Sequence, residues 1–227
     1  MQEKSIRIIK PFFKANFMKK IILFTMLFFT LNSSFSQSFM NGVGVHLLGN
    51  TNTIGGSNDI GFGVGVIYSP RFNFLEKEKF SLSVGLPITL GFTVSASNTE
   101  DLYSDYQNAS IGLVVNAPVM LNINMGRGST KENKEKFGYF AGAGFGYQYG
   151  IFASDIYDPL RNEYVEDYST SVFGPAANAG VRFGIGRKSK NLELRLSYMQ
   201  GLKKADIISA YYSKRPANFG FAVLFNF

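Results

Sequence analysis

The sequence predicts an all-β protein, an eight-stranded antiparallel up-and-down barrel that crosses a membrane. After Gln37, apolar residues recur at every second position, and no window keeps them at helical spacing. The residues between them are mainly glycine and small polar types with few charges. The 227 residues include no cysteine, 24 glycines and 23 phenylalanines, which excludes disulfide scaffolds, thiolate metal sites and a disordered chain.

A targeting segment precedes the predicted barrel. Met18-Lys19-Lys20 starts an uncharged run to Leu31, and the small side chains of Ser34 and Ser36 precede Gln37. These features predict a secretory signal peptide over 18–36, since a transmembrane helix needs about 20 apolar residues. Residues 1–17 are expected to be upstream sequence from a misassigned start, and 37–227 to be the barrel domain.

The net charge says little about partners. Residues 1–36 carry six basic groups and one acidic group, so only +2 of the formal charge of +7 belongs to the remainder. No nucleic-acid partner is therefore expected.

Eight segments with period-two alternation are the predicted strands. Their order along the chain is 39–47, 60–68, 80–92, 111–123, 137–147, 173–185, 192–198 and 219–227. The connections expected outside the cell are longer on average (50–59, 95–109, 150–171 and 201–215) than those expected inside (71–79, 125–136 and 187–190). This asymmetry is typical of outer-membrane barrels, which have short periplasmic turns.

The charge content of the second face indicates which face meets lipid. Only Arg182, Glu193 and Arg195 are charged there, whereas roughly 25–35 % of a soluble surface is charged. This face is therefore expected to line a narrow lumen filled by side chains, including Phe140, Met120 and Met199. Aromatic residues at both ends of the apolar face predict two membrane-interface girdles. The alternative is a soluble lipocalin-like barrel with the faces inverted.

Three segments carry a resemblance to a known family. They are Phe35-Ser36 before Gln37, the strand 81–88, and the alternating segment 219–227 that ends on Phe227. The chain resembles the Bacteroidetes outer-membrane protein beta-barrel domain family, which includes PorT-like proteins, and eight-stranded barrels of the OmpA and OmpX type. The resemblance implies an assembly signal for the barrel-assembly machinery in the last strand, at Phe219, Phe221, Phe225 and Phe227.

The three lumen charges are the first candidate site. Arg182 lies on one strand of a predicted hairpin, and Glu193 and Arg195 lie on the other. We expect a structural ion cluster that neutralises buried charge and holds the strand register. The alternative is a polar gate for a small solute.

His46, the only histidine, is expected on the lumen face. A general base in a lipid A-modifying enzyme is the functional alternative, but no serine and carboxylate are predicted beside it. We expect no catalytic residue, no metal site, no cofactor and no enzyme activity. Glycines with a strict period of two are expected to be small lumen residues rather than a phosphate loop. Pro87 and Pro118 predict a local bulge.

The outer connections combine acidic residues with tyrosines, and the inner turns sum to +6. A cell-surface binding role is one interpretation, and hydrophilic connections without a ligand are the other. Loop 201–215, with Lys203, Lys204, Lys214 and Arg215, is a candidate contact for lipopolysaccharide phosphates. The candidate surface-binding residues are Glu100, Asp101, Asp105, Asp155, Asp158, Glu163, Glu166 and Asp167.

The sequence thus predicts a monomeric outer-membrane barrel of a Gram-negative bacterium, with a closed lumen and a structural or surface-binding role. Its expected partners are outer-membrane lipid, lipopolysaccharide, the assembly machinery and an unidentified envelope protein. A narrow solute channel, a PorT-like secretion accessory and a lipid A-modifying enzyme are the alternatives.

Overall fold

The computed structural model describes residues 38–54, 57–101, 104–158, 163–186, 190–202 and 216–227. The predictions for 1–17, the signal peptide over 18–36 and the basic residues of 203–215 lie outside this range. No helix in the described part is long and apolar enough to span a membrane. The described strands are β1 Ser38–Met40, β2 Gly42–Ile54, β3 Ser57–Tyr68, β4 Arg71–Lys77, β5 Phe80–Gly85, β6 Ile88–Asp101, β7 Ser104–Asn116, β8 Val119–Gly126, β9 Phe137–Asp158, β10 Glu163–Gly184, β11 Asn191–Gln200 and β12 Ala217–Asn226.

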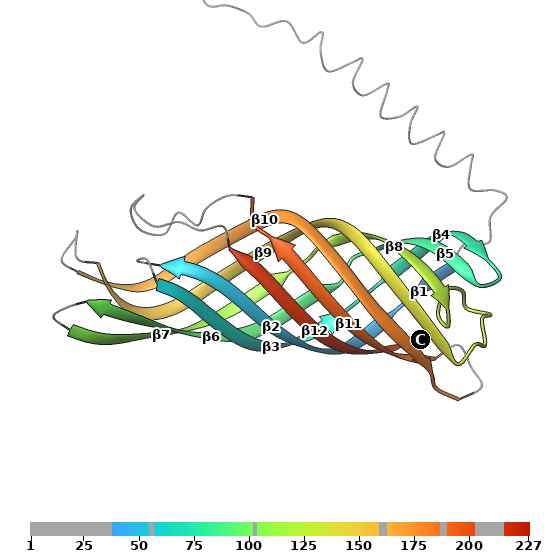
Figure 1. Cartoon of the computed structure of the whole chain (residues 1–227), viewed down its shortest axis with the longest axis horizontal. Coiled ribbons are helices and arrows are strands. Elements are labelled where there is room, and N and C mark those ends of the chain that lie inside the picture. Colours follow the sequence, from blue (N-terminus) through green and yellow to red (C-terminus); the bar gives the residue numbers. More distant parts are fainter. Residues whose placement is uncertain (1–37, 55–56, 102–103, 159–162, 187–189, 203–215) are drawn as a thin grey trace, which may run out of the picture. The chain divides into compact units, whose positions relative to one another are not determined.

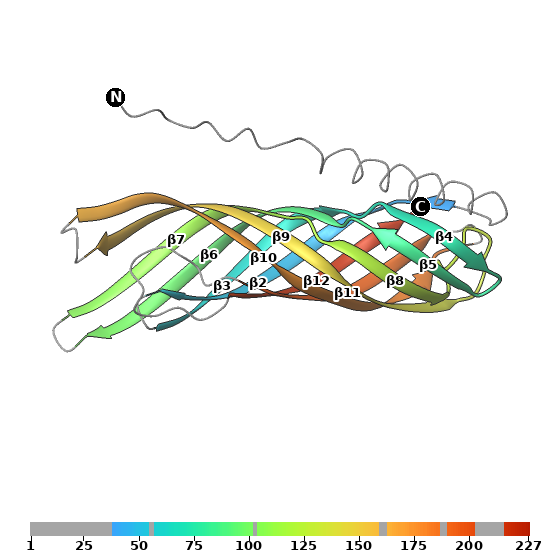
Figure 2. The ribbon, with the colours of Figure 1, turned by 90° about the horizontal axis from the view of Figure 1, so that it is seen from above.

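These strands form a closed antiparallel barrel with eight wall strands (Figures 1 and 2). Four wall strands consist of two pieces each, β1–β2, β3–β4, β5–β6 and β7–β8, and the other four are β9 to β12. Each wall strand pairs with its neighbours in the sequence. The last strand, β12, pairs with β2, where Val223 lies opposite Val45. The predicted fold class is confirmed.

The apolar face points outward, as predicted. Phe62 is 71 % exposed, Phe92 65 % and Leu196 63 %, and every wall strand contributes exposed large apolar residues. Aromatic residues contact one another across strands on this face, as in the pairs Tyr198–Phe219 and Phe137–Phe183, whose ring centroids are 5.2 and 5.4 Å apart. The inward residues are buried, so the side chains of the lumen form the core.

The ladder is interrupted at Pro87 and Pro118, but the predicted bulge is wrong. Gly85 pairs with Met120 on one side and Thr89 with Asn116 on the other, in the same register. Pro87 therefore lies opposite Pro118, and neither has an N–H for the ladder. Because the interruptions match, no extra residue is needed. Register shifts occur elsewhere, between Asn73 and Leu75 and between Val165 and Asp167.

Many residues that the sequence analysis predicts to lie in connections belong to strands in the structure. β4 occupies most of 71–79, and β2 and β3 extend into 50–59. β6 and β7 pair as far as Asp101↔Ser104, and β9 and β10 as far as Asp158↔Glu163. The sequence of these segments does not alternate regularly between apolar and polar residues, so the pattern that predicts strands is absent from them.

Candidate functional site

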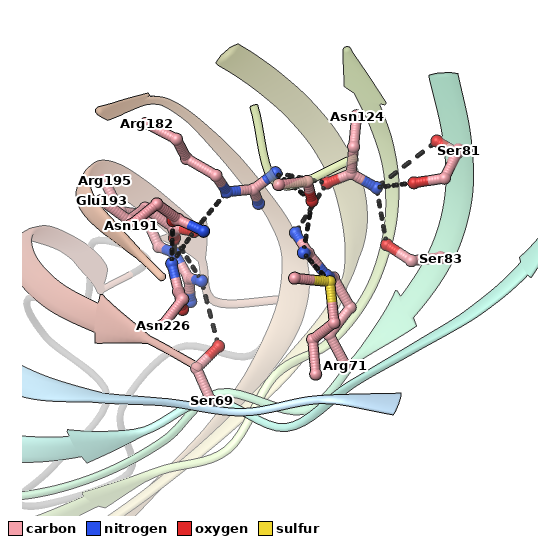
Figure 3. Close-up of polar contacts among 12 residues, drawn as sticks. Ser69, Arg71, Ser81, Ser83, Asn124, Arg182, Asn191, Glu193, Arg195 and Asn226 are labelled. Atoms are coloured by element: carbon pink, nitrogen blue, oxygen red, sulfur yellow. Dashed lines mark hydrogen bonds and ion pairs between the residues drawn. The ribbon is translucent and has the colours of Figure 1, made fainter. Parts of the chain in front are cut away.

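The three predicted lumen charges lie in contact at one end of the barrel (Figure 3). Strands β10 and β11 place Arg182 directly opposite Glu193. Arg182 Nε donates to Glu193 Oε2 at 2.6 Å, and Arg195 Nε donates to Glu193 Oε1 at 2.8 Å. Asn226 Nδ2 adds a third donor, to Oε2 at 3.0 Å. Arg182 and Glu193 are each 1 % exposed, so their charges interact with little screening by water.

Two further arginines make the expectation of only three lumen charges wrong. Arg71 and Arg127 are 8 % and 2 % exposed. Arg71 stands at the start of β4, and Arg127 directly follows β8; both lie in segments predicted as turns. Their sequence signal was weak because neither stands within an alternating apolar run.

Asn124 joins Arg71 to Arg182. Its side-chain oxygen accepts a hydrogen bond from Nη1 of each arginine at 3.0 Å. Its nitrogen donates to the hydroxyls of Ser81 and Ser83 at 3.2 and 2.9 Å. An amide can hold this position because it accepts through one atom and donates through the other. The ion cluster is thereby extended across the lumen from β11 to β5 (Figure 3).

Phe140 of β9 fills the space beside the cluster, as predicted for a lumen plug. It is 4 % exposed, and the guanidinium carbons of Arg182 and Arg195 lie 4.2 and 5.5 Å from its ring centroid. Cation–π attraction at these distances favours both arginines. Met120 and Met199, the other expected plugs, are buried and pack in one cluster with Val172 and Ala176.

The segment between β8 and β9 covers this end of the lumen. Within it, Ser129 is fully buried, and its carbonyl accepts a hydrogen bond from Asn73 of β4 at 2.9 Å. Gly128 O accepts from Arg71 Nη2 at 2.6 Å, and Arg127 Nη2 donates to Lys190 O at 2.9 Å. These partners come from separate parts of the ring of strands, so the segment crosses the end of the barrel.

An exposed ion pair ties the same segment to the β4–β5 turn. Lys79 Nζ lies 2.9 Å from Glu135 Oε1. The hydrogen bond to Glu135, together with its charge, raises the pKa of the Lys79 ammonium. The pair adds little stability, because exposed ion pairs are screened by water.

His46 is buried in the lumen, as expected. Its Nδ1 lies 2.8 Å from Thr89 Oγ1, and its Nε2 lies 3.5 Å from Ser197 Oγ. Ser197 on β11 was not predicted as a neighbour, because the register between distant strands is not visible in the sequence. A hydroxyl, rather than a carboxylate, contacts Nδ1, so the described geometry does not form a Ser-His-carboxylate arrangement.

The acidic candidates for surface binding lie on strands rather than in the predicted connections. Glu100 and Asp101 end β6, and Asp105 is the second residue of β7. Asp155 and Asp158 lie on β9, and Glu163, Glu166 and Asp167 on β10. Their side chains are outside the described part of the structure. Among the residues that are described, no cluster of three or more His, Asp or Glu side chains could hold a metal ion.

The last strand positions the four phenylalanines of the expected assembly signal. Phe219, Phe221 and Phe227 are exposed on the outer face of β12 or directly after it, and Phe225 is half-buried. β12 pairs with β11 on one side and β2 on the other, so it is the strand that closes the barrel. Recognition by assembly machinery stays a prediction.

Comparisons with known proteins found similar solved structures only. No protein-family model and no curated protein matches the sequence. Solved structures similar to it include Ail, the attachment invasion locus protein of Yersinia pestis, with 12 % identity over 83 % of this chain and 98 % of that chain and a TM-score of 0.41. Neisserial surface protein A is 10 % identical over 84 % of this chain and 97 % of its own, with a TM-score of 0.43. The outer membrane protein OprG from Pseudomonas aeruginosa is 11 % identical over 85 % of this chain and 95 % of its own, with a TM-score of 0.46. The fold assignment therefore depends on this chain's own strand pairing.

The covered lumen leads to a testable prediction. We expect no discrete conductance from the purified protein in planar bilayers, because Phe140 and the β8–β9 segment obstruct the lumen. Combining Phe140→Ala with Arg127→Ala removes a plug and the link between this segment and Lys190, and small steps should then appear. Discrete conductance in the unmodified protein would contradict a closed lumen. The single variant Glu132→Ala, on the exposed side of the same segment, is the control.

Proposed function

We propose that this chain is an integral outer-membrane β-barrel with a closed lumen and a structural or surface-binding role. The observation that carries the proposal is that the usual arrangement of soluble proteins, with apolar side chains inside and polar side chains outside, is reversed. Large apolar side chains cover the outside of a closed barrel, while arginines, asparagines and serines fill the inside. Soluble monomers rarely expose apolar patches larger than a few hundred Å², so the apolar face is suited to lipid.

The strand lengths support the membrane assignment. β11 and β12 have 10 residues each, which is the length that a tilted strand needs to cross the hydrocarbon core. Away from Pro87 and Pro118, backbone hydrogen bonds pair the wall strands with their neighbours, as required where no water is available. Proteins that cross bacterial outer membranes as barrels are closed antiparallel sheets of this kind.

The longer strands support a role at the cell surface. β9 and β10 have 22 residues each, about twice the crossing length. The pairing of β7 with β9 ends at Ser110↔Ser154, whereas β9 and β10 pair with each other to Asp158↔Glu163. The ends of β6–β7 and β9–β10 therefore continue as separate two-stranded ribbons beyond the barrel wall. They would present the acidic candidate residues to a protein, a glycan or ions that bridge lipopolysaccharide.

The closed lumen favours this role over a solute channel, and the hydroxyl beside His46 favours it over an acyl-transfer enzyme. The PorT-like likeness and the secretion role stay predictions from the sequence. A monomer in contact with lipid and lipopolysaccharide is the state proposed for the barrel.

Heat-modifiability in cell fractions tests the proposal. Unboiled protein from the outer-membrane fraction should migrate differently in SDS gels from boiled protein, because a closed barrel resists SDS until heated. Leu121→Arg places a charge on the lipid face, at a residue that is 60 % exposed, and should strongly reduce the heat-modifiable form, since arginine costs about 2–4 kcal/mol near the bilayer midplane.

The matched control introduces the same arginine side chain away from the lipid face. Glu132→Arg, in the exposed part of the β8–β9 segment, should leave migration unchanged. A heat-indifferent protein in the soluble periplasmic fraction, or equal behaviour of the two arginine variants, would overturn the proposal.

A further inference from the structure

A lysine lies on the apolar outer face of the barrel, at its rim. Lys190 directly precedes β11 and is exposed, and its ammonium nitrogen lies 5.7 Å from the ring centroid of Phe225, on the outer face of β12. We propose that Lys190 binds the phosphate group of an anionic phospholipid in the membrane leaflet that meets this rim. The inference rests on the proposed outer-membrane location of the barrel.

The neighbours of Lys190 identify the end of the barrel to which it belongs. Arg127, in the β8–β9 segment, donates from Nη2 to Lys190 O, and Gly126 N donates to Lys79 O in the β4–β5 turn at 2.9 Å. The ribbons of β6–β7 and β9–β10 extend from the opposite end. Outer-membrane barrels have their short turns on the periplasmic side, so Lys190 stands at the inner rim.

Two hydrogen bonds fix the backbone of Lys190. Its carbonyl accepts from Ile185 N at 3.0 Å and from Arg127 Nη2 at 2.9 Å. The residues that follow the ends of β10 and β8 and the residue that precedes β11 are thereby joined at one point. Both bonds use the carbonyl and neither uses the ammonium, so the position of Lys190 at the rim is held while its side-chain donors are left for a ligand.

The surroundings of Lys190 on the outer face are apolar. Ile185 is 45 % exposed and Phe227 is 49 % exposed, and the rings of Phe225 and Phe227 stack with their centroids 6.3 Å apart. A lysine beside such a surface lays its hydrocarbon stem along the apolar side chains and extends its ammonium into the polar layer. In a membrane, this layer is formed by the lipid headgroups.

The protein supplies no counter-charge to this ammonium. No carboxylate of the described residues forms an ion pair with Lys190. Glu135, in the nearby β8–β9 segment, is paired with Lys79, and Glu193 is buried in the ion cluster. An exposed ammonium with three donors, above an apolar surface, is complementary to the phosphate of a lipid whose acyl chains cover that surface.

Native mass spectrometry with added lipid tests the site. The refolded protein in neutral detergent micelles is titrated with phosphatidylglycerol, and separately with phosphatidylethanolamine that has the same acyl chains. Phosphatidylglycerol should bind at the lower concentration, because its headgroup has a net negative charge. Lys190→Gln should raise the phosphatidylglycerol concentration needed for half occupancy about fivefold, the factor expected for one lysine beside anionic lipid. Binding of phosphatidylethanolamine should change much less.

Lys131→Gln is the matched control. It removes the same charge from an exposed lysine of the β8–β9 segment, which crosses the end of the lumen, and its binding of both lipids should equal that of the unmodified protein. Lys190→Arg keeps the charge and should keep the preference for phosphatidylglycerol. Equal phosphatidylglycerol binding by Lys190→Gln and Lys131→Gln would overturn the proposal.

Heat-modifiability of the same samples separates this proposal from the membrane assignment. A heat-modifiable barrel whose phosphatidylglycerol binding does not depend on Lys190 would overturn the headgroup site alone. An unmodified protein that is heat-indifferent and binds neither lipid would overturn the membrane assignment and the headgroup site together. Since only the carbonyl of Lys190 is bonded, Lys190→Gln should itself be heat-modifiable like the unmodified protein.

Discussion

Replacing Glu193 by alanine is expected to lower the free energy of unfolding by about 3–5 kcal/mol, the usual effect of removing one partner from a buried ion pair. Arg182 and Arg195 would both lose the carboxylate they contact, and Asn226 would lose one of its two acceptors. The loss should appear as a lower urea midpoint of the refolded barrel in micelles. Circular dichroism is the suitable signal, because the chain has no tryptophan.

Two other variants separate the role of the charge from other effects. Glu193→Gln keeps the shape and one acceptor but removes the charge, and we expect a smaller loss in the same direction. Glu132→Ala removes an exposed carboxylate and should leave the midpoint unchanged. A midpoint for Glu193→Ala equal to that of Glu132→Ala would show that the cluster does not stabilise the barrel.

Gly144→Ala is expected to have the second large effect, at or above the upper end of the ~1–3 kcal/mol usual for overpacking. A Cβ at Gly144 would clash with Val119 O and would lie 3.0 Å from Met120 Cα. Both atoms are backbone of β8, so no side-chain rotation can relieve the clash. The β8–β9 pairing would have to shift, and we expect a strong decrease in folded barrel, measured as the heat-modifiable fraction after refolding.

Gly85→Ala is the control for this substitution. Gly85 also faces the lumen, but a Cβ there would meet Asn122 Nδ2 at 3.4 Å and Pro70 O at 3.7 Å, which are ordinary contacts. Its refolding yield should match that of the unmodified chain. Equal yields for Gly144→Ala and Gly85→Ala would contradict the close approach of β8 and β9.

The sequence by itself determined the strand number, the barrel class and the direction of each face. Phe62 and Leu196 point outward because alternation assigns each residue to one side of a strand, and this information is local. The hairpin contact between Arg182 and Glu193 was predictable for a similar reason, since a short turn fixes which residues face each other. The long outer hairpins were not predictable, because their sequence does not alternate regularly between apolar and polar residues.

Only the tertiary structure decided how the lumen is filled. Arg71 and Arg127 enter it from segments that look like exposed turns, and Asn124 then joins Arg71 to Arg182. Ser197 lies beside His46, although 151 residues separate them in the chain. These contacts depend on the closure of the ring and on the stagger between strands far apart in sequence. Alternation specifies which side of the wall a residue occupies, but closure determines which residues meet across the lumen.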